Sequence, residues 1–415
     1  MRGDNLADEP PSTLSESQHS EIHGHGEGKI GRVEIAIIIC VAAIYVYLRF
    51  FYGVGTIFGF PLYYFLLPFG FAVGVWLALR MSELAVRGLG AAAIYFGLSL
   101  YAVGVLSSIA SNTPELVIGL LMSWRGYTHP DPVVGLTLTE TSILTVLTAS
   151  GFNTLLLSLI IILGSTKKGR VRVPREVILH ESELIRSTFI AIMMIFMFGL
   201  ILHVFPVGGG AGGIGYIPRI AALCLLLIYV SYVIQLLRRR SVNMTISPAK
   251  TEPSKPPENN LREHNPAISK RLALVFIIVA FLGIFIAGEI ITSTVELAIE
   301  HLELAIPVVA LIVGACGSIP EHGIALVAAR KGQINVALGN IIGGLAQIVL
   351  MVLGVVGIVV PIPLDAFVLF QLIVTGWVLY YVKRAILDDE CLDAFEGFII
   401  LVFQILAFSL LLGLV

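Results

Sequence analysis

The chain has 415 residues, of which 57% are hydrophobic and only 13% are charged, and its mean hydropathy is +0.93. Soluble domains carry about 25% charged residues, so this composition excludes a soluble enzyme, a nucleic-acid-binding protein and a secreted disulfide scaffold. The net charge of −2 points to no class of partner. The four cysteines are too widely spaced for a readable metal site or disulfide framework: Cys40, Cys224, Cys316 and Cys391.

The N-terminal segment 1–32 differs in composition from the remaining chain. It is polar and contains three histidines, His19, His23 and His25. Because it cannot bury enough apolar surface to offset the entropy of ordering, we expect a disordered tail. A histidine-rich stretch is compatible with loose metal binding, although a solvated tail is the simpler interpretation. The segment lacks the basic, apolar and cleavage regions of a signal peptide.

About eleven apolar stretches follow the tail, and a bilayer span requires ~20 mostly apolar residues. The pattern predicts helices at 33–53, 57–80, 92–126, 133–164, 188–205, 216–237, 271–294, 304–330, 333–360, 363–384 and 394–415. The third of these stretches is too long for one straight span.

The segment 238–270 is basic, rich in proline and without apolar periodicity, so we interpret it as a cytosolic linker. It divides the spans after the first into five plus five. The predicted fold class is an all-α polytopic membrane protein with about 11 transmembrane helices. Its expected organisation is a tail at 1–32, an extra N-terminal transmembrane helix at 33–56, a first five-helix repeat at 57–237, the linker at 238–270 and a second five-helix repeat at 271–415.

The distribution of Lys and Arg in the loops predicts the orientation of the spans. Basic residues cluster in 165–187 and in the linker, and further basic pairs follow at Arg330 with Lys331 and at Lys383 with Arg384. The loops between them contain no Lys or Arg: 54–56, 206–215, 295–303 and 361–362. We therefore expect a cytosolic N-terminus and an external C-terminus, in the cell membrane, with the two five-helix halves running antiparallel.

An internal repeat occupies corresponding positions of the two halves. Its copies contain NTPELVIGLLMSWRG and SIPEHGIALVAARKG, which align Pro114 with Pro320 and Glu115 with Glu321. Each copy predicts an interrupted helix, because proline removes a backbone donor. Such a break is tolerated at membrane depth where the freed carbonyls meet protein, water or an ion. Inverted repeats with interrupted helices indicate a transporter site near the bilayer midplane.

The two glutamates predict a cation site. Glu115 and Glu321 lie far inside apolar segments, where a charge costs at least ~2.5 kcal/mol. At a repeat interface they would also repel, so the site requires a cation, a proton or both. Asn112 and Ser318 each precede a glutamate by three residues and share its helix face. These oxygen ligands suit Ca²⁺ better than a soft metal. A structural pair is the alternative, and the symmetry of the two Pro-Glu pairs argues against it.

The next segment of the second half adds two amide candidates. Asn340 and Gln347 lie on one helix face, and amides in hydrocarbon need partners. We therefore include both in the predicted metal site. The neighbouring glycines allow close helix approach, and plain packing accounts for them equally well: Gly339, Gly343 and Gly344.

These segments resemble the calcium/cation antiporter superfamily, whose two repeats typically read G-T-S-L-P-E-L and G-N-x-x-G-S. The second repeat supplies the specific matches, CGSIPEH and ALGNIIGGLAQI, and the first supplies ASNTPEL. The pair Glu321–His322, the ending Gln347–Ile348, the tail ILDDECLDAFEGFIILV and the extra first helix are similar to the proton/calcium exchanger branch. The resemblance covers about residues 60–415 and implies a Ca²⁺ antiporter built from inverted repeats.

The first repeat departs from the family pattern. Ala110–Asn112 stands where the family has G-T-S. In the following helix, either Ser142 or the pair Ser150 and Asn153 replaces the family's Gly-Ser-x-x-x-Asn, and the sequence leaves both alternatives open. Glu140 is either a third carboxylate of the site or a residue at the mouth of a shorter helix.

The expected activity is export of cytosolic Ca²⁺ in exchange for H⁺ by alternating access. Glu115 and Glu321 would bind Ca²⁺ when ionised and take up protons once Ca²⁺ leaves, because repulsion and burial disfavour two bare charges. His322 would relay protons, tune the pKa of the site or make a structural hydrogen bond. Sodium/calcium exchangers carry an acidic residue where Ile348 stands here, so the smaller fixed charge favours H⁺ over Na⁺.

Na⁺/Ca²⁺ exchange on the same scaffold is the alternative function. The expected partners are inorganic cations and the lipid bilayer, without nucleic acid and without a cofactor besides the transported Ca²⁺ and H⁺, or Na⁺. An intramembrane hydrolase is disfavoured because the chain has neither H-E-x-x-H nor G-x-S-x-G. A membrane scaffold without transport leaves the buried glutamate pair unexplained.

Overall fold

The computed structural model describes residues 36, 40, 43–45, 47, 56–57, 60–96, 100–173, 175–205, 215–238, 268–302, 304–330 and 334–413. The contacts divide the chain into two units, Met1–Phe51 and Tyr52–Val415. The predicted tail, most of the first predicted span and residues 239–267 of the predicted linker lie outside the described residues. The elements that follow all belong to the second unit.

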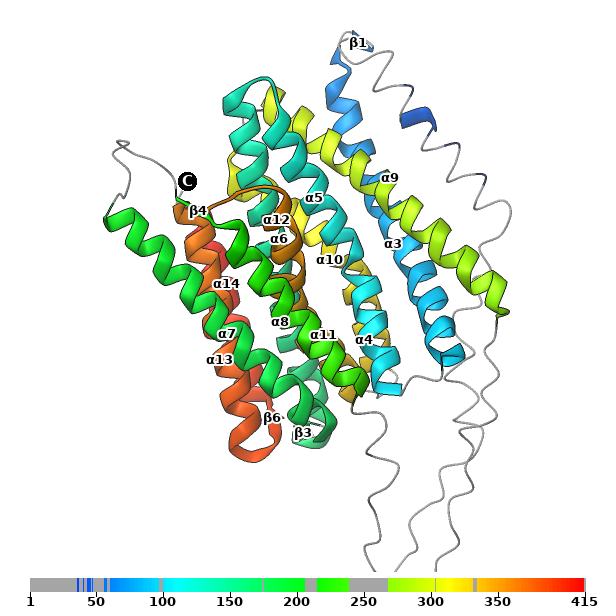
Figure 1. Cartoon of the computed structure of the whole chain (residues 1–415), viewed down its shortest axis with the longest axis vertical. Helices are drawn as coiled ribbons and strands as arrows, with labels where there is room; N and C mark the ends of the chain where they lie inside the picture. The colour runs from blue at the N-terminus through cyan, green and yellow to red at the C-terminus, as the bar shows by residue number, and fades with distance from the viewer. Residues whose placement is uncertain are drawn as a thin grey trace, which may run out of the picture. The chain divides into compact units, whose positions relative to one another are not determined.

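Helices make up most of the second unit (Figure 1). The first half contains β1 Thr56–Ile57, β2 Phe60–Pro61, α3 Tyr63–Tyr95, α4 Leu100–Ser111, α5 Thr113–Thr128, α6 Pro132–Lys168, β3 Arg170–Arg172, α7 Arg175–Val204, β4 Tyr216–Ile217 and α8 Arg219–Arg238. The second half contains α9 Lys270–Leu302, α10 Ile306–Arg330, α11 Ile334–Gln347, the π-helix η4 Ile348–Val352, α12 Leu353–Val359, β5 Ile362–Pro363, α13 Ala366–Asp389, β6 Cys391–Asp393 and α14 Ala394–Gly413.

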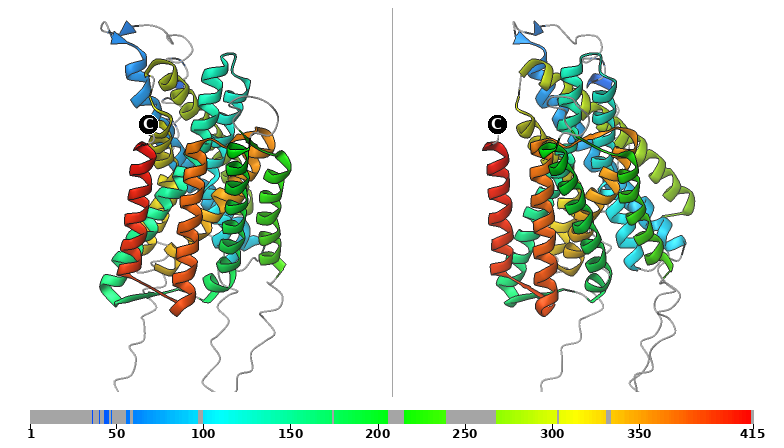
Figure 2. Two further views of the ribbon diagram at one scale, coloured as in Figure 1. Left: turned by 90° about the vertical axis from the view of Figure 1, so that its left-hand side faces the viewer. Right: turned by 60° about the vertical axis from the view of Figure 1, so that its left-hand side comes forward.

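Seven helices of the described chain are long and apolar enough to cross a membrane, and the bent pair α4–α5 makes an eighth. α8 and the first part of α10 are shorter apolar helices. These candidate spans and shorter helices together agree with a polytopic all-α membrane protein, and they are compatible with the predicted set of spans. Figure 2 shows α14, in red, at the edge of the bundle. α14 exposes large apolar side chains there, as a lipid-facing helix does: Phe398, Phe403 and Leu406.

The packing of the helices repeats itself between the two halves. α3 packs against α9 and α7 against α13, while α6 packs against α14 as α12 does against α8. The two small sheets follow the same rule: β3 after α6 pairs with β6 before α14, and β4 before α8 pairs with β5 after α12. Figure 1 shows these sheets at opposite ends of the bundle. This exchange of equivalent elements is the arrangement of two inverted repeats.

The predicted boundary between the second and third spans is wrong. Instead of ending near 80, α3 continues through Arg80 and Arg87 to Tyr95. Arg80 pairs with Glu83 one turn away, and the segment contains no proline after Pro68 that would end the helix. α9 likewise runs beyond the predicted 294. At 33 residues each, the two helices are about 50 Å long, so they extend beyond a hydrocarbon core of about 30 Å.

The predicted interruption in the first repeat is confirmed. α4 and α5 meet at Asn112 with a bend of 40°. Pro114 occupies the first turn of α5, where its missing N–H would have no helical partner in any case. The bend directs the start of α5, and with it Glu115, into the interior of the bundle.

The interruption predicted for the second repeat is wrong, because α10 is helical from Ile306 to Arg330. A proline removes one backbone donor, and the hydrogen bonds on either side still hold the helix together. The irregularity of this half comes later, where the five residues after Gln347 form the π-helix η4. Short π-helical turns inside α-helices occur frequently at functional sites.

Candidate cation site

The two predicted glutamates meet between the repeats. Glu115 lies in the first turn of α5 and is 4% exposed, while Glu321 on α10 is fully buried. A Cβ placed on Gly317, one turn before Glu321, would lie 3.5 Å from Glu115 Cγ. The carboxylate of Glu321 is close enough to act electrostatically on that of Glu115. Each half of the chain therefore contributes one carboxylate to a single buried position.

Polar side chains around the two glutamates form hydrogen bonds between neighbouring helices. Asn112 Nδ2 donates to Gln347 Oε1 at 2.8 Å, and Ser108 Oγ donates to the same oxygen at 3.2 Å. On the other side, Asn153 Nδ2 donates to Glu321 Oε2. Asn153 Oδ1 lies 3.0 Å from His322 Nε2. All of these hydrogen bonds join one repeat to the other, so they place the site at the repeat interface.

Four buried oxygen atoms of the site make no hydrogen bond within the described part of the chain: Glu115 Oε1, Glu115 Oε2, Glu321 Oε1 and Asn112 Oδ1. Leaving a buried acceptor unpaired costs about 1–3 kcal/mol, and more for a charged group. Several oxygen atoms of this kind can be satisfied at once by coordinating a single hard cation. The donor set, two carboxylates and amide oxygens, therefore fits Ca²⁺.

Three serines of the prediction already donate hydrogen bonds to backbone carbonyls. Ser318 Oγ donates to the carbonyl of Ala315 in its own helix. Ser150 Oγ donates to the Leu147 carbonyl and lies 3.3 Å from Thr375 Oγ1. Ser142 Oγ donates to the Gly119 carbonyl. Of the alternatives left open for this helix, Asn153 is the residue that reaches a glutamate.

Asn340 and Glu140 occupy different surroundings. Asn340 is partly buried, and its Nδ2 has no hydrogen-bond partner in the described structure. Glu140, 9% exposed, faces Asp365 at the start of α13. It precedes Asn153 by 13 residues on α6, a helical distance of about 20 Å. The structure thus keeps Glu140 apart from the glutamate pair and next to Asp365, whose pKa burial raises.

Two contributors to the site escaped the sequence analysis. Ser108 donates to Gln347, and its spacing of four residues from Asn112 is a sign that both share a helix face. Gly344 borders Glu321 so closely that a Cβ there would overlap Glu321 Oε1. The sequence predicted only that Gly344 allows close approach of helices, because a sequence does not show which side chain lies against a glycine.

The comparisons with known proteins agree with this architecture. The family model described as "Sodium/calcium exchanger protein" matches residues 271–412. No curated protein matches the sequence. A crystal structure of the H⁺/Ca²⁺ exchanger CAX is similar to this chain, with a TM-score of 0.62 at 12% identity over 92% of this chain and 93% of that one.

Structures of the sodium-calcium exchanger NCX_Mj are similar as well. In one of them the TM-score is 0.54 at 18% identity, over 83% of this chain and 98% of the exchanger. A second, soaked with Na⁺ and Sr²⁺, gives a TM-score of 0.53 at 17% identity with the same coverage. The second half of the chain therefore matches the sodium/calcium exchanger sequence family, and most of its length has the fold of the solved exchangers.

Proposed function

We propose that this protein is a secondary active antiporter that moves Ca²⁺ across the membrane in exchange for another cation. The observation that carries the proposal is the buried glutamate pair, one from each inverted repeat, which together with Asn112 presents four buried oxygen atoms that make no hydrogen bond within the described residues. A pair of carboxylates at an interface between repeats can be exposed first to one side and then to the other. The structural neighbours, an H⁺/Ca²⁺ exchanger and a sodium-calcium exchanger, support the same interpretation.

Glu115 and Glu321 hold the ion in this proposal, and the amides position them. Ca²⁺ takes 6–8 oxygen ligands at about 2.3–2.6 Å. The two carboxylates and Asn112 Oδ1 supply some of these ligands, and water supplies the rest. Gln347 fixes the Asn112 amide so that its oxygen stays free, while Asn153 holds one oxygen of Glu321.

His322 acts in this scheme as a positioning residue. The Asn153 amide nitrogen donates to Glu321, so its oxygen is the group that faces His322. The Nε2 atom of His322 must therefore donate to Asn153 Oδ1, because a carbonyl oxygen only accepts. The imidazole thus holds the amide in the orientation that serves the carboxylate, and an amide between the two offers no direct path for a proton.

We propose H⁺ as the coupling ion, with Na⁺ as the alternative. When Ca²⁺ leaves, two neighbouring carboxylates in a site of low dielectric constant require another positive charge, and protons reach the same oxygens without additional ligands. Na⁺ coupling needs places for several ions. At the position where the resemblance puts an acidic residue in sodium-coupled relatives, Ile348 is apolar and fully buried.

Ca²⁺ affinity is expected to fall as the pH is lowered, because protons and Ca²⁺ compete for the two glutamates. The affinity should change about tenfold per pH unit for each proton released. Calorimetry on the purified protein, across pH in K⁺ and then in Na⁺ buffers, measures both the affinity and the protons released. An affinity that ignores pH and collapses in Na⁺ would refute proton coupling and support Na⁺/Ca²⁺ exchange.

The proposed direction is export from the cytosol, which requires the basic loops to face inward. In a variant without its four natural cysteines, a cysteine replacing Asn259 in the linker should react with an impermeant maleimide only after permeabilisation. A cysteine replacing Gly209 should react without it. Labelling of intact cells or right-side-out vesicles checks this, and the reverse pattern would invert the orientation and contradict the export direction.

A further inference from the structure

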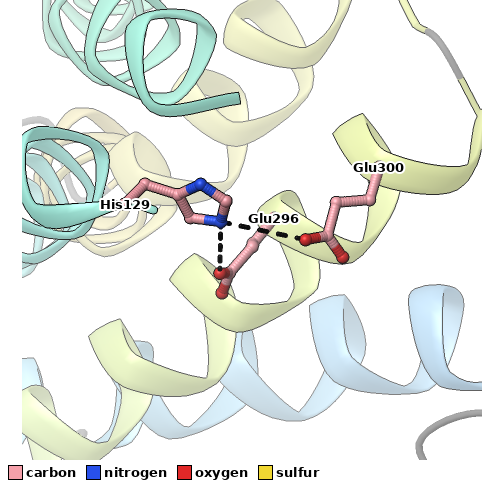
Figure 3. Close-up of side chains that lie close together, drawn as sticks. All are labelled: His129, Glu296 and Glu300. Carbon is pink, nitrogen blue, oxygen red and sulfur yellow. Dashed lines mark ion pairs between the residues drawn. The ribbon is translucent and has the colours of Figure 1, made fainter. Parts of the chain in front are cut away.

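A second group of metal-ligating side chains lies far from the glutamate pair. His129 ends α5 at the turn that leads into α6, and Glu296 and Glu300 lie one turn apart on α9 (Figure 3). Their side chains are 12%, 15% and 34% exposed, respectively. His129 follows Glu115 by 14 residues on α5, a helical distance of about 20 Å. This His129 cluster is therefore separate from the proposed transport site.

The three side chains converge without closing on one another. His129 Nε2 lies 3.6 Å from Glu296 Oε1 and 3.9 Å from Glu300 Oε1, and one ligand atom of each residue lies within 4.8 Å of the others. Ligand atoms at about 2.1 Å from a tetrahedral ion lie about 3.4 Å from each other. The two distances from His129 Nε2 exceed this spacing by about half an ångström or less, and the distance between the two carboxylate oxygens exceeds it by at most about 1.4 Å, which rotation of the glutamate side chains can close.

The carboxylates in and around the His129 cluster outnumber the positively charged side chains there. Arg125 pairs with Glu289 and, at 2.6 Å, with Glu296 Oε2. One guanidinium therefore pairs with two carboxylates, and the third, that of Glu300, makes no ion pair with Arg125. His301 also lies 4.0 Å from Glu300, but it adds a charge only when protonated. Because Arg125 occupies only Oε2 of Glu296, the other oxygen remains turned toward His129.

Backbone atoms of Asp131 contact Nδ1 of the His129 ring. The Asp131 N–H donates to Nδ1 at 3.1 Å when Nε2 carries the ring proton, and Nδ1 also lies 3.0 Å from the Asp131 carbonyl oxygen. In the other tautomer Nδ1 donates to that carbonyl, and Nε2, which is directed at the two carboxylates, is left unprotonated for a metal ion. An N–H donated to a backbone carbonyl fixes the tautomer of many histidine ligands.

We propose that His129, Glu296 and Glu300 form a binding site for a divalent transition metal of the Zn²⁺ class. One imidazole nitrogen and two carboxylate oxygens suit Zn²⁺, whose four-coordinate sites with three protein ligands keep one position for water. Ca²⁺ is a poor match, because it takes 6–8 oxygen ligands and no nitrogen. A bound ion joins the turn between α5 and α6 to α9.

Zn²⁺ titration by calorimetry on the full chain tests the site. The titration uses a background in which His19, His23 and His25 are replaced by alanine, because imidazoles of the tail would compete for the added metal. We expect one Zn²⁺ per chain, and His129→Ala should weaken its binding at least about tenfold. The matched control is His203→Ala, an exposed histidine in the last turn of α7, which should leave Zn²⁺ binding unchanged.

Two further measurements separate this site from the transport site. Glu300→Gln should also weaken Zn²⁺ binding, whereas the double variant Glu115→Gln with Glu321→Gln should retain it. X-ray absorption of the Zn²⁺ complex should show one imidazole nitrogen among oxygen ligands. Unchanged Zn²⁺ affinity in His129→Ala, or Zn²⁺ binding lost only in the Glu115 and Glu321 double variant, would overturn the proposal. Neither result would change the case for Ca²⁺ exchange, which rests on the glutamate pair.

Discussion

Replacing Glu321 by glutamine is expected to abolish Ca²⁺ exchange in proteoliposomes, and Glu115→Gln should do the same. Each change removes one of the two charges that face the ion and keeps the shape of the side chain. Removing one partner of a buried ion pair costs about 3–5 kcal/mol, which is a loss of over about a hundredfold in Ca²⁺ affinity. ⁴⁵Ca²⁺ uptake driven by an imposed pH gradient measures the transport, and calorimetry measures the binding.

Glu140→Gln is the matched control for both substitutions. Glu140 is also a buried carboxylate of a membrane-spanning helix, but it lies next to Asp365 and apart from the pair. Its replacement should leave Ca²⁺ affinity within about threefold of the wild type. Without Ca²⁺, Glu115→Gln should unfold no more easily than the wild type, because it removes a repulsion between buried like charges. Wild-type exchange in either glutamate variant would contradict the two-glutamate site.

Gly344→Ala is expected to weaken Ca²⁺ binding strongly while the protein still folds. A Cβ at this position would overlap Glu321 Oε1. The overlapped atom is the far end of a flexible side chain, so the carboxylate moves and the helices stay. Once displaced, Glu321 loses the hydrogen bond from Asn153 and its alignment with Glu115. We expect Ca²⁺ affinity to fall about tenfold or more and unfolding free energy to fall by about 1–3 kcal/mol.

Gly323→Ala provides the comparison in the same region. Gly323 is exposed, lies two residues after Glu321 in α10, and has no neighbouring atom within 4 Å of an added Cβ. An alanine in a helix interior is favoured over glycine by about 1 kcal/mol, so this variant should be at least as stable as the wild type and should bind Ca²⁺ normally. Equal Ca²⁺ affinity in Gly344→Ala and Gly323→Ala would show that Glu321 does not need its observed position.

Features that depend only on residues close together along the chain were predictable from the sequence alone. Apolar runs about as long as a bilayer is thick predict membrane helices, and the structure contains them. Pro114 predicted the bend at the start of α5, because proline acts on its own backbone. Glu115 and Glu321 were recognisable because a carboxylate deep in an apolar run needs a special reason. The helix-breaking preference of proline gave the wrong prediction at Pro320, because the remaining backbone hydrogen bonds keep α10 helical on both sides of it.

The partners of these residues were decided only by the tertiary structure. Ser150 and Asn153 are three residues apart on one helix, and the rotation of α6 against α10 selects Asn153 as the partner of Glu321. Gly344 and Glu321 meet for the same reason, and so do His129 and Glu296 on helices 167 residues apart in the chain. Which side chains meet between distant helices depends on how the helices rotate and pack, and a single sequence carries no local pattern for that choice.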